Sequence, residues 1–155
     1  MGKKLLIVNG PNLNMLGIRE PELYGKLDFA ALCAFVREAC EKAGAEGTLF
    51  QSNHEGELVE VIQKAYGVYD GIVINPAAYT HTSVAILDAL KAVGLPAAEV
   101  HLTDVQAREE FRRISYPGMA CLKTFAGFGF DGYRLAVEYL LEYLKEKERK
   151  KEESA

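Results

Sequence analysis

Leu5-Leu6-Ile7-Val8 is the stretch of sequence that decides the fold, and the polar turn Asn9-Gly10-Pro11-Asn12 follows it directly. A short run of consecutive apolar residues that ends in a turn is typical of a strand buried on both faces of a sheet. Ile72-Val73-Ile74 has the same character further along the chain. Strands of this kind favour a parallel sheet with helices over both of its faces.

Outward from that strand, short β-rich runs alternate with longer helical ones. Residues 29–43 carry apolar side chains at helical spacing, with Asp28 as the N-cap and Gly44 at the end. Strands that alternate with helices indicate βαβ units. The sequence therefore predicts an α/β fold of the flavodoxin-like type, a five-stranded parallel sheet in the order 2-1-3-4-5 with helices on both faces. The other strands are expected at 48–50, 72–74, 98–102 and 120–125, and the other helices at about 58–65, 84–94 and from about 133.

The length of 155 residues fits one domain. Residues 1–144 are predicted to form it, and residues 145–155 a charged C-terminal tail that is either a fraying helix end or disordered. Residues 105–115 are short and charged, which makes the helix after the fourth strand weak.

Composition excludes several classes of function. The net charge of -4 gives no basic face for a nucleic-acid partner. No apolar run approaches the ~20 residues of a membrane span, and the apolar run at residues 5–8 is too short for a signal peptide, so we expect a cytoplasmic protein.

The three cysteines, an odd number without CxxC spacing, argue against a disulfide framework. Cys33 and Cys40 are expected to be buried, reduced thiols.

Polar side chains follow every predicted strand from the first to the fourth. Ligands of open α/β sheets bind at the carboxyl ends of the strands, and all three histidines of the chain fall at that edge, which predicts a site there. The residues concerned are Asn9, Asn12, Asn14, Arg19 and Tyr24 after the first strand; Ser52, Asn53, His54 and Glu55 after the second; Asn75, Tyr79, Thr80 and His81 after the third; and Glu99, His101, Thr103 and Arg112 at and after the end of the fourth.

The segment 9–28 has about twenty residues and no apolar periodicity. Loops of that length in compact domains are lids, binding loops or disordered segments. A surface loop without function and a lid that carries Arg19 and Tyr24 both remain open on this pattern.

The residue types narrow the chemistry. The chain has no GxSxG elbow for acyl transfer, and Asn9-Gly10-Pro11-Asn12 is neither a P-loop nor a GxGxxG turn. The histidines lack i,i+4 spacing and a carboxylate that would complete a ligand set, so a metal site is not favoured. Acid–base chemistry on a polar small molecule remains, with Arg19 or Arg112 available for a carboxylate. Two rivals are a flavodoxin- or receiver-like binding module and a structural subunit without activity.

Five motifs in order resemble those of the type II dehydroquinases, over roughly residues 4–144. One such motif would be weak, whereas five with this spacing are specific. They are Asn9-Gly10-Pro11-Asn12-Leu13-Asn14, the segment 19–25 (REPELYG), 51–58 (QSNHEGEL), 74–83 (INPAAYTHTS), and Glu99-Val100-His101 with 108–112 (REEFR).

The resemblance implies a hydro-lyase without cofactor or metal that converts 3-dehydroquinate to 3-dehydroshikimate by trans dehydration, through an enolate, in the shikimate pathway of chorismate and aromatic amino acid biosynthesis. It implies Tyr24 as the general base and Arg19 as the cation that stabilises its phenolate. It also implies that His101 protonates the departing hydroxyl while Glu99 orients its imidazole. Asn12 would place a water on the enolate, and the substrate would be bound by Asn75, His81, Asp88, Leu102, Thr103 and Arg112.

These roles agree with elementary chemistry. A free tyrosine titrates near ~10 and acts as a base at neutral pH only beside a cation, and histidine is the natural proton donor near neutral pH. The resemblance further implies a dodecamer of four trimers, in which Asp88 reaches a neighbouring subunit's site.

Two of the departures from the family pattern bear on the site. Ala77 stands where glycine is often found, which predicts a backbone that does not need positive φ. Asp104 stands in place of asparagine beside the proposed binding site for the substrate carboxylate. Its charged side chain either weakens substrate binding or turns away and caps the following short helix.

Overall fold

The computed structural model describes residues 2–18 and 27–154. Within them, five strands form one sheet in the order β2-β1-β3-β4-β5, and every pairing is parallel. This confirms the order predicted from the sequence. The strands are β1 (Lys4–Asn9), β2 (Glu46–Gln51), β3 (Gly71–Asn75), β4 (Ala97–His101) and β5 (Lys123–Ala126).

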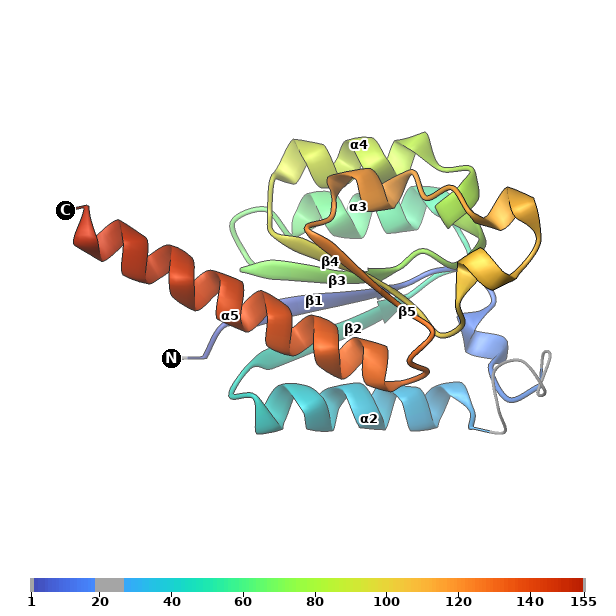
Figure 1. Ribbon diagram of the computed structural model, residues 1–155, viewed down its shortest axis with the longest axis horizontal. Helices are drawn as coiled ribbons and strands as arrows, with labels where there is room; N and C mark the ends of the chain where they lie inside the picture. Colours follow the sequence, from blue (N-terminus) through green and yellow to red (C-terminus); the bar gives the residue numbers. More distant parts are fainter. Residues whose placement is uncertain (1, 19–26, 155) are drawn as a thin grey trace.

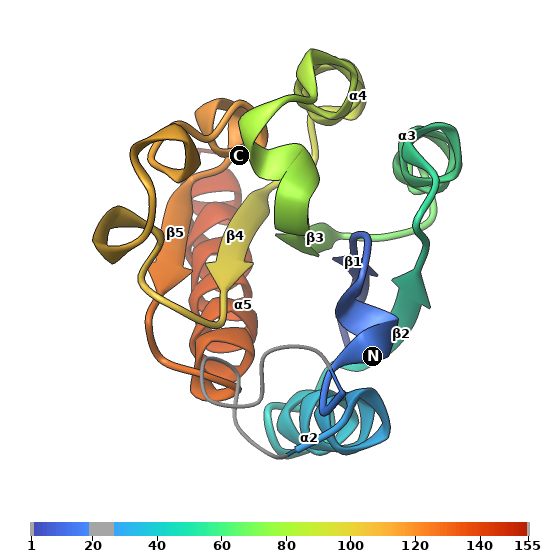
Figure 2. The ribbon, with the colours of Figure 1, turned by 90° about the vertical axis from the view of Figure 1, so that its right-hand side faces the viewer.

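Four α-helices of the described chain cover the sheet in two pairs. Figure 1 shows α3 (Glu55–Lys64) and α4 (Val84–Val93) over one face, and α2 (Phe29–Lys42) and α5 (Asp131–Glu153) over the other. Figure 2 views the carboxyl ends of the strands and shows the sheet between the two helix pairs. The structure is thus the three-layer α/β arrangement that the alternating pattern predicts.

The apolar run of β1 is explained by two separate cores. Leu5 and Ile7 belong to the cluster beneath α2 and α5, whereas Leu6 and Val8 belong to the cluster beneath α3 and α4. Side chains alternate between the faces of a strand, so a strand covered on both faces must be apolar at every position. Each such side chain contributes about 1.5–3 kcal/mol by its burial.

The expected helix caps are present. The Asp28 side chain accepts a hydrogen bond from the Ala31 amide at the start of α2. Gly94 ends α4 with φ 65°, a conformation that glycine adopts without a steric cost. The boundaries of both helices therefore follow from their sequence.

The region after β4 is less regular. Short 3-10 turns occupy Val105–Ala107 and Glu110–Arg112, as the weak helical pattern predicted. The fifth strand was predicted to start at 120 but starts at Lys123, because Pro117–Ala120 form another 3-10 turn. Pro117 fixes φ at the first position of that turn and lacks the amide hydrogen that a strand needs.

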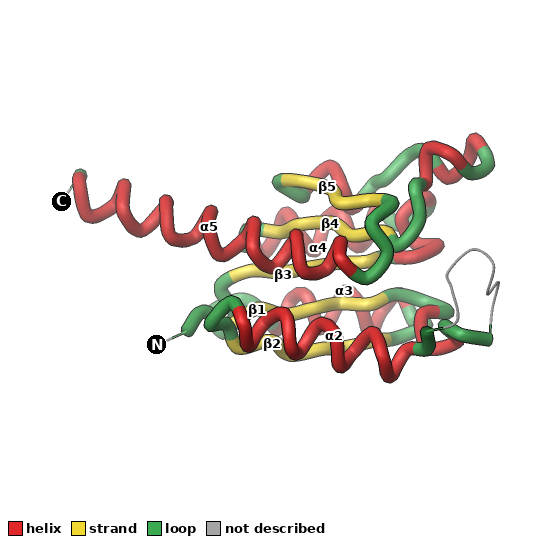
Figure 3. The backbone as a smooth tube through the Cα atoms, turned by 60° about the horizontal axis from the view of Figure 1, so that its bottom comes forward, coloured by secondary structure: helices red, strands yellow, loops and turns green. Residues whose placement is uncertain are grey.

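The C-terminal residues continue α5 to Glu153, and Figure 3 shows this helix projecting beyond the sheet. Leu144 is the last buried residue of the helix, and Arg149 beyond it pairs with Glu146 and Glu153. Of the two expected states of the tail, the structure has the helical one over residues 145–153. The division of the chain at residue 144 stays a prediction. No helix in the described ranges combines the length and apolar character needed to cross a membrane.

All three cysteines are free thiols, with Cys40 buried and Cys33 and Cys121 half-buried. Burial raises the pKa of all three and brings that of Cys121 to about 12. Cys40 fits the predicted buried thiol fully and Cys33 only in part.

Candidate active site

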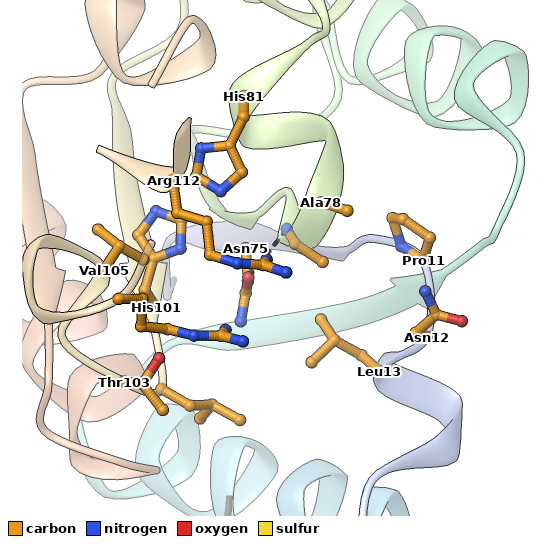
Figure 4. Close-up of a pocket in the computed structure, with 13 residues that line it drawn as sticks. Pro11, Asn12, Leu13, Asn75, Ala78, His81, His101, Thr103, Val105 and Arg112 are labelled. Atoms are coloured by element: carbon orange, nitrogen blue, oxygen red, sulfur yellow. Dashed lines mark hydrogen bonds between the residues drawn. The ribbon is translucent and has the colours of Figure 1, made fainter. Parts of the chain in front are cut away.

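A pocket opens at the carboxyl ends of β1, β3 and β4, the edge at which the sequence predicted a site. Figure 4 shows the side chains that surround it. His54 is exposed before α3, Asp88 is exposed on α4, and neither lines the pocket. The lining residues are Pro11, Asn12, Leu13, Asn75, Ala77, Ala78, His81, His101, Leu102, Thr103, Val105, Arg108 and Arg112.

The loop after β1 meets the loop after β3 at Gly10. Its amide donates to the Asn75 carbonyl at 2.8 Å, and a Cβ at this position would lie 2.4 Å from the Pro76 carbonyl oxygen. Only glycine allows the two backbones to approach this closely. The contact brings Asn12 and Asn75 to one pocket.

Two non-glycine residues beside this contact have positive φ, Asn12 at 69° and Ala77 at 53°. The expectation that Ala77 avoids positive φ is therefore wrong. The turn into the 3-10 helix Ala77–His81 requires it, and the Asn75 side chain accepts from the Ala77 amide at 3.1 Å. The left-handed conformation costs an alanine about 1–2 kcal/mol. Asn12 adopts this conformation more readily, and its backbone amide donates to Oδ1 of the Asn53 side chain at 2.9 Å.

His101 and Glu99 form a buried pair at the end of β4. Nε2 of His101 lies 2.8 Å from Oε2 of Glu99, and the two residues are 6% and 1% exposed. They point to the same face of the strand because they are two residues apart. Nε2 is engaged by Glu99, so Nδ1 is the ring nitrogen that remains for the pocket.

Glu99 also accepts hydrogen bonds from the hydroxyls of Ser115 and Thr124. Burial raises the pKa of the Glu99 carboxyl, but the donors His101, Ser115 and Thr124 outweigh this effect and leave the pKa below its usual value. The carboxylate is thus ionised at neutral pH, and the proton between it and His101 resides on Nε2.

His81 is held through its other ring nitrogen, Nδ1. Its Nδ1 lies 2.8 Å from the Ile114 carbonyl, which can only accept, so Nδ1 carries a proton and Nε2 is left for the pocket. Burial lowers the pKa of His81, although the hydrogen bond to Ile114 opposes this effect. The ring stands edge-on to Phe111, with centroids 6.5 Å apart.

Two arginines bring positive charge to the pocket. Figure 4 shows the Arg112 side chain extending into it. Nε of Arg112 donates to Glu109, and the guanidinium lies over the Phe111 ring at 4.9 Å. The terminal nitrogens of Arg112 therefore remain for an anion. Arg108 also lines the pocket; sequence reasoning missed it, although its i,i+4 spacing from Arg112 was a signal.

Asn75 is braced by a residue that sequence reasoning missed. Its side-chain amide donates to the Tyr133 hydroxyl at 3.0 Å, and that hydroxyl donates to Asn9 at 2.6 Å. Tyr133 is fully buried, and burial raises its pKa, so the hydroxyl keeps its proton. The amide of Asn75 is therefore fixed from two sides, since its oxygen accepts from Ala77.

Asp104 turns towards the following turn. Its carboxylate accepts from the Gln106 amide at 3.0 Å and caps the 3-10 helix Val105–Ala107. This is the second of the two alternatives foreseen for the residue. Leu102 and Thr103, which precede it, line the pocket.

Not every predicted site residue is found in the pocket wall formed by the described residues. Arg19 and Tyr24 lie outside the described residues. Glu99 stands behind His101 and does not line the pocket. Within residues 2–18 and 27–154, no group of three or more His, Cys, Asp or Glu side chains is arranged to hold a metal ion.

The chain is similar to proteins that are named dehydroquinase or 3-dehydroquinate dehydratase. Residues 3–141 match the family model described as dehydroquinase class II. A protein from Clostridium beijerinckii called 3-dehydroquinate dehydratase is 51% identical over 138 residues, 88% of this chain and 94% of that protein. One with the same name from Carboxydothermus hydrogenoformans is 50% identical over 145 residues, 94% of each. The crystal structure of the type II dehydroquinase from Butyrivibrio crossotus matches with a TM-score of 0.88 and 46% identity over 90% of this chain and 97% of that one.

Proposed function

The chain belongs to the class II dehydroquinase family, and we propose that its pocket is where it carries out the family's reaction. That reaction is the dehydration of 3-dehydroquinate to 3-dehydroshikimate in the shikimate pathway, and the chain is a hydro-lyase. The observation that carries the assignment of the pocket is His101 in its wall, paired with Glu99 behind it. Hydroxide leaves poorly and needs a proton, which an imidazolium held by a carboxylate supplies.

In the proposed mechanism, Tyr24 as a phenolate removes a proton next to the ketone of the substrate, and Arg19 stabilises that phenolate. His101 then protonates the departing hydroxyl from Nδ1 while Nε2 stays bonded to Glu99. The elimination leaves a conjugated enone and one water. Tyr24 and Arg19 are assigned by their place in the family motif.

The enolate between the two steps needs donors where its charge develops. Asn12 is proposed to hold a water on the enolate oxygen. Asn75 and His81 are proposed to bind ring hydroxyls, which fits the fixed amide of Asn75 and the free Nε2 of His81. The backbone amides of Leu102 and Thr103, with the Thr103 hydroxyl, are proposed to bind the carboxylate. Arg112 completes the set and offers its terminal guanidinium nitrogens.

The test is the absorbance of the enone product after 3-dehydroquinate is added to the purified chain. We expect activity that survives EDTA, because no step in the mechanism uses a metal ion. Tyr24→Phe should abolish proton abstraction yet still bind substrate, since the hydroxyl serves only the chemical step. Near-normal turnover in Tyr24→Phe would overturn the mechanism, and EDTA inactivation reversed by zinc would overturn the metal-free claim.

The exposed position of Asp88 on α4, outside the wall of this chain's own pocket, supports a role in a neighbouring subunit. We propose that the chain assembles into a dodecamer of four trimers and acts in the cytoplasm. Light scattering that found a fully active monomer would contradict the assembly. Fractionation that placed the protein outside the cytoplasm would contradict its location.

A further inference from the structure

We propose that Ser115 and Thr124 are positioning residues for the dehydration. Their hydroxyls hold the Glu99 carboxylate against Nε2 of His101, so that Nδ1 is presented to the pocket. The proposal rests on the role of His101 as the proton donor and adds the groups that keep this donor in one orientation. Neither hydroxyl belongs to the pocket wall, so both act through Glu99.

The two hydroxyls reach Glu99 from different parts of the fold. Thr124 on β5 is the direct partner of Glu99 in the parallel ladder, and its Oγ1 donates to Oε1 at 2.7 Å. Ser115, between the 3-10 turns Glu110–Arg112 and Pro117–Ala120, donates to Oε2, the oxygen that also accepts from His101. Both carboxylate oxygens are therefore fixed, and the group cannot rotate without losing a hydrogen bond.

The direction of the Ser115 hydroxyl is fixed by Gly118. The Gly118 amide donates to Oγ of Ser115 at 2.9 Å, which occupies a lone pair and leaves the hydroxyl hydrogen for Glu99. A Cβ on Gly118 would lie 2.5 Å from Oε1 of Glu99 and 2.7 Å from Oγ of Ser115. The turn thus packs its backbone directly against the carboxylate, and a larger residue has no room there.

The arrangement also favours the charged form of Glu99. A carboxylate that is 1% exposed is costly unless donors surround it, and here three donors do so. An ionised carboxylate accepts from Nε2, which fixes the neutral imidazole as the Nε2–H tautomer. Without the two hydroxyls, Glu99 gains freedom to turn or take up a proton, and the imidazole loses its single orientation.

The kinetic test compares Ser115→Ala with Thr124→Val. The first removes a hydroxyl that donates to Glu99 and accepts from the Gly118 amide, and the second removes the hydroxyl that donates to Glu99. We expect kcat to fall about tenfold in each, as the loss of one hydrogen bond to a charged group predicts, with KM near that of the unaltered chain. Thr124→Ser keeps the hydroxyl and should restore kcat. Ser83→Ala is the matched control, because Oγ of Ser83 also accepts an amide three residues on, that of Ile86, where it caps α4.

Two further measurements separate positioning from a general loss of structure. In a Glu99→Gln background, Ser115→Ala and Thr124→Val should add little, because the residue through which they act is already altered. Nitrogen-15 spectra of labelled histidine, recorded without substrate, should show His101 as the Nε2–H tautomer in the unaltered chain and in Ser83→Ala. In the Ser115→Ala/Thr124→Val double variant, the same signals should show a mixture of tautomers.

The outcomes are distinguishable. Unaltered kcat in both single variants, undiminished losses in the Glu99→Gln background, or an unaltered His101 tautomer in the double variant would each overturn the proposal. If the unaltered chain did not dehydrate 3-dehydroquinate, the proposed function would be wrong. The spectra would still show whether Ser115 and Thr124 keep His101 in one tautomer through Glu99.

Discussion

The 3-10 helix after β3 and the end of β4 each bring one histidine to the same pocket, but the two rings are held through different nitrogens and by partners of different charge. His81 donates from Nδ1 to a backbone carbonyl, whereas His101 donates from Nε2 to an ionised carboxylate. A carbonyl oxygen fixes the orientation of the ring, but it carries no full negative charge that would favour protonation of the ring. A carboxylate fixes the ring and also stabilises its cation.

The difference teaches that the partner, and not the residue type, sets what each histidine can do. The lowered pKa of His81 keeps it neutral, which suits a hydrogen bond to a substrate hydroxyl. The pairing with Glu99 suits His101 to carry and deliver a proton. Substitutions of the two histidines and of the residues that hold them test this difference.

The largest effect is expected from replacing the histidines themselves. His101→Asn should lower kcat about 10²–10⁴-fold, because it removes the proton donor. His81→Asn should instead raise KM about tenfold and change kcat less, because it removes a binding hydrogen bond. Steady-state kinetics by enone absorbance separate the two. If both variants lost kcat equally, the contrast between the histidines would be wrong.

Glu99→Gln tests the charge of the partner. The amide keeps the shape of the side chain but not its negative charge, so kcat should fall about tenfold or more. The His101 signals in nitrogen-15 spectra should also change from the Nε2–H tautomer to a mixture, because an amide can turn either its oxygen or its NH2 group towards Nε2. Glu138→Gln, which removes an exposed carboxylate paired with Arg134 on α5, is the control and should leave kcat and the tautomer unaltered. An unaltered kcat in Glu99→Gln would show that the reaction does not need the charge of this carboxylate.

Gly118→Ala tests the packing behind His101. The added methyl would crowd Glu99 and Ser115, so we expect a loss of about 1–3 kcal/mol in unfolding free energy together with a lower kcat. Gly56→Ala is the control, because a Cβ there meets nothing within 4 Å in α3. That change should stabilise the chain by about 0.5–1 kcal/mol. Denaturant unfolding of both variants checks the pair, and equal stabilities would contradict the close contact.

The smallest effect concerns His81 and pH. Its folded-state pKa lies below the usual 6.5, so the unfolded chain binds the proton more readily. The stability that this provides is present above about pH 6.5 and is lost as the pH falls through the folded pKa. Unfolding measured between about pH 7 and pH 5 should therefore lose less stability in His81→Gln than in the unaltered chain. A steeper loss of stability with falling pH in His81→Gln than in the unaltered chain would contradict the lowered pKa of His81.

Much of the sheet and of the pocket edge could be predicted from the sequence. The apolar run at Leu5–Val8 and the alternation of strands with helices determine a parallel sheet, and parallel strands bring their carboxyl ends to one edge. His81, His101 and Arg112 could therefore be placed at one pocket from the order of the strands and the residues that follow them.

The parts that could not be predicted depend on contacts between distant residues or on local strain. Ser115 and Thr124 are 16 and 25 residues from Glu99, and Tyr133 is 124 residues from Asn9, in segments whose periodicity says nothing of such contacts. Ala77 was misjudged because residue type suggested an ordinary backbone, whereas the turn held by Asn75 imposes positive φ.

The most direct test of the central claim is the tautomer of each pocket histidine, read from nitrogen-15 spectra of the unaltered chain without substrate. With both rings neutral, the structure predicts that His81 is protonated on Nδ1 and His101 on Nε2. Assignment by His81→Asn and His101→Asn identifies the signals. The same tautomer on both rings, or His101 protonated on Nδ1 alone, would contradict the claim that Glu99 holds His101 as the proton donor.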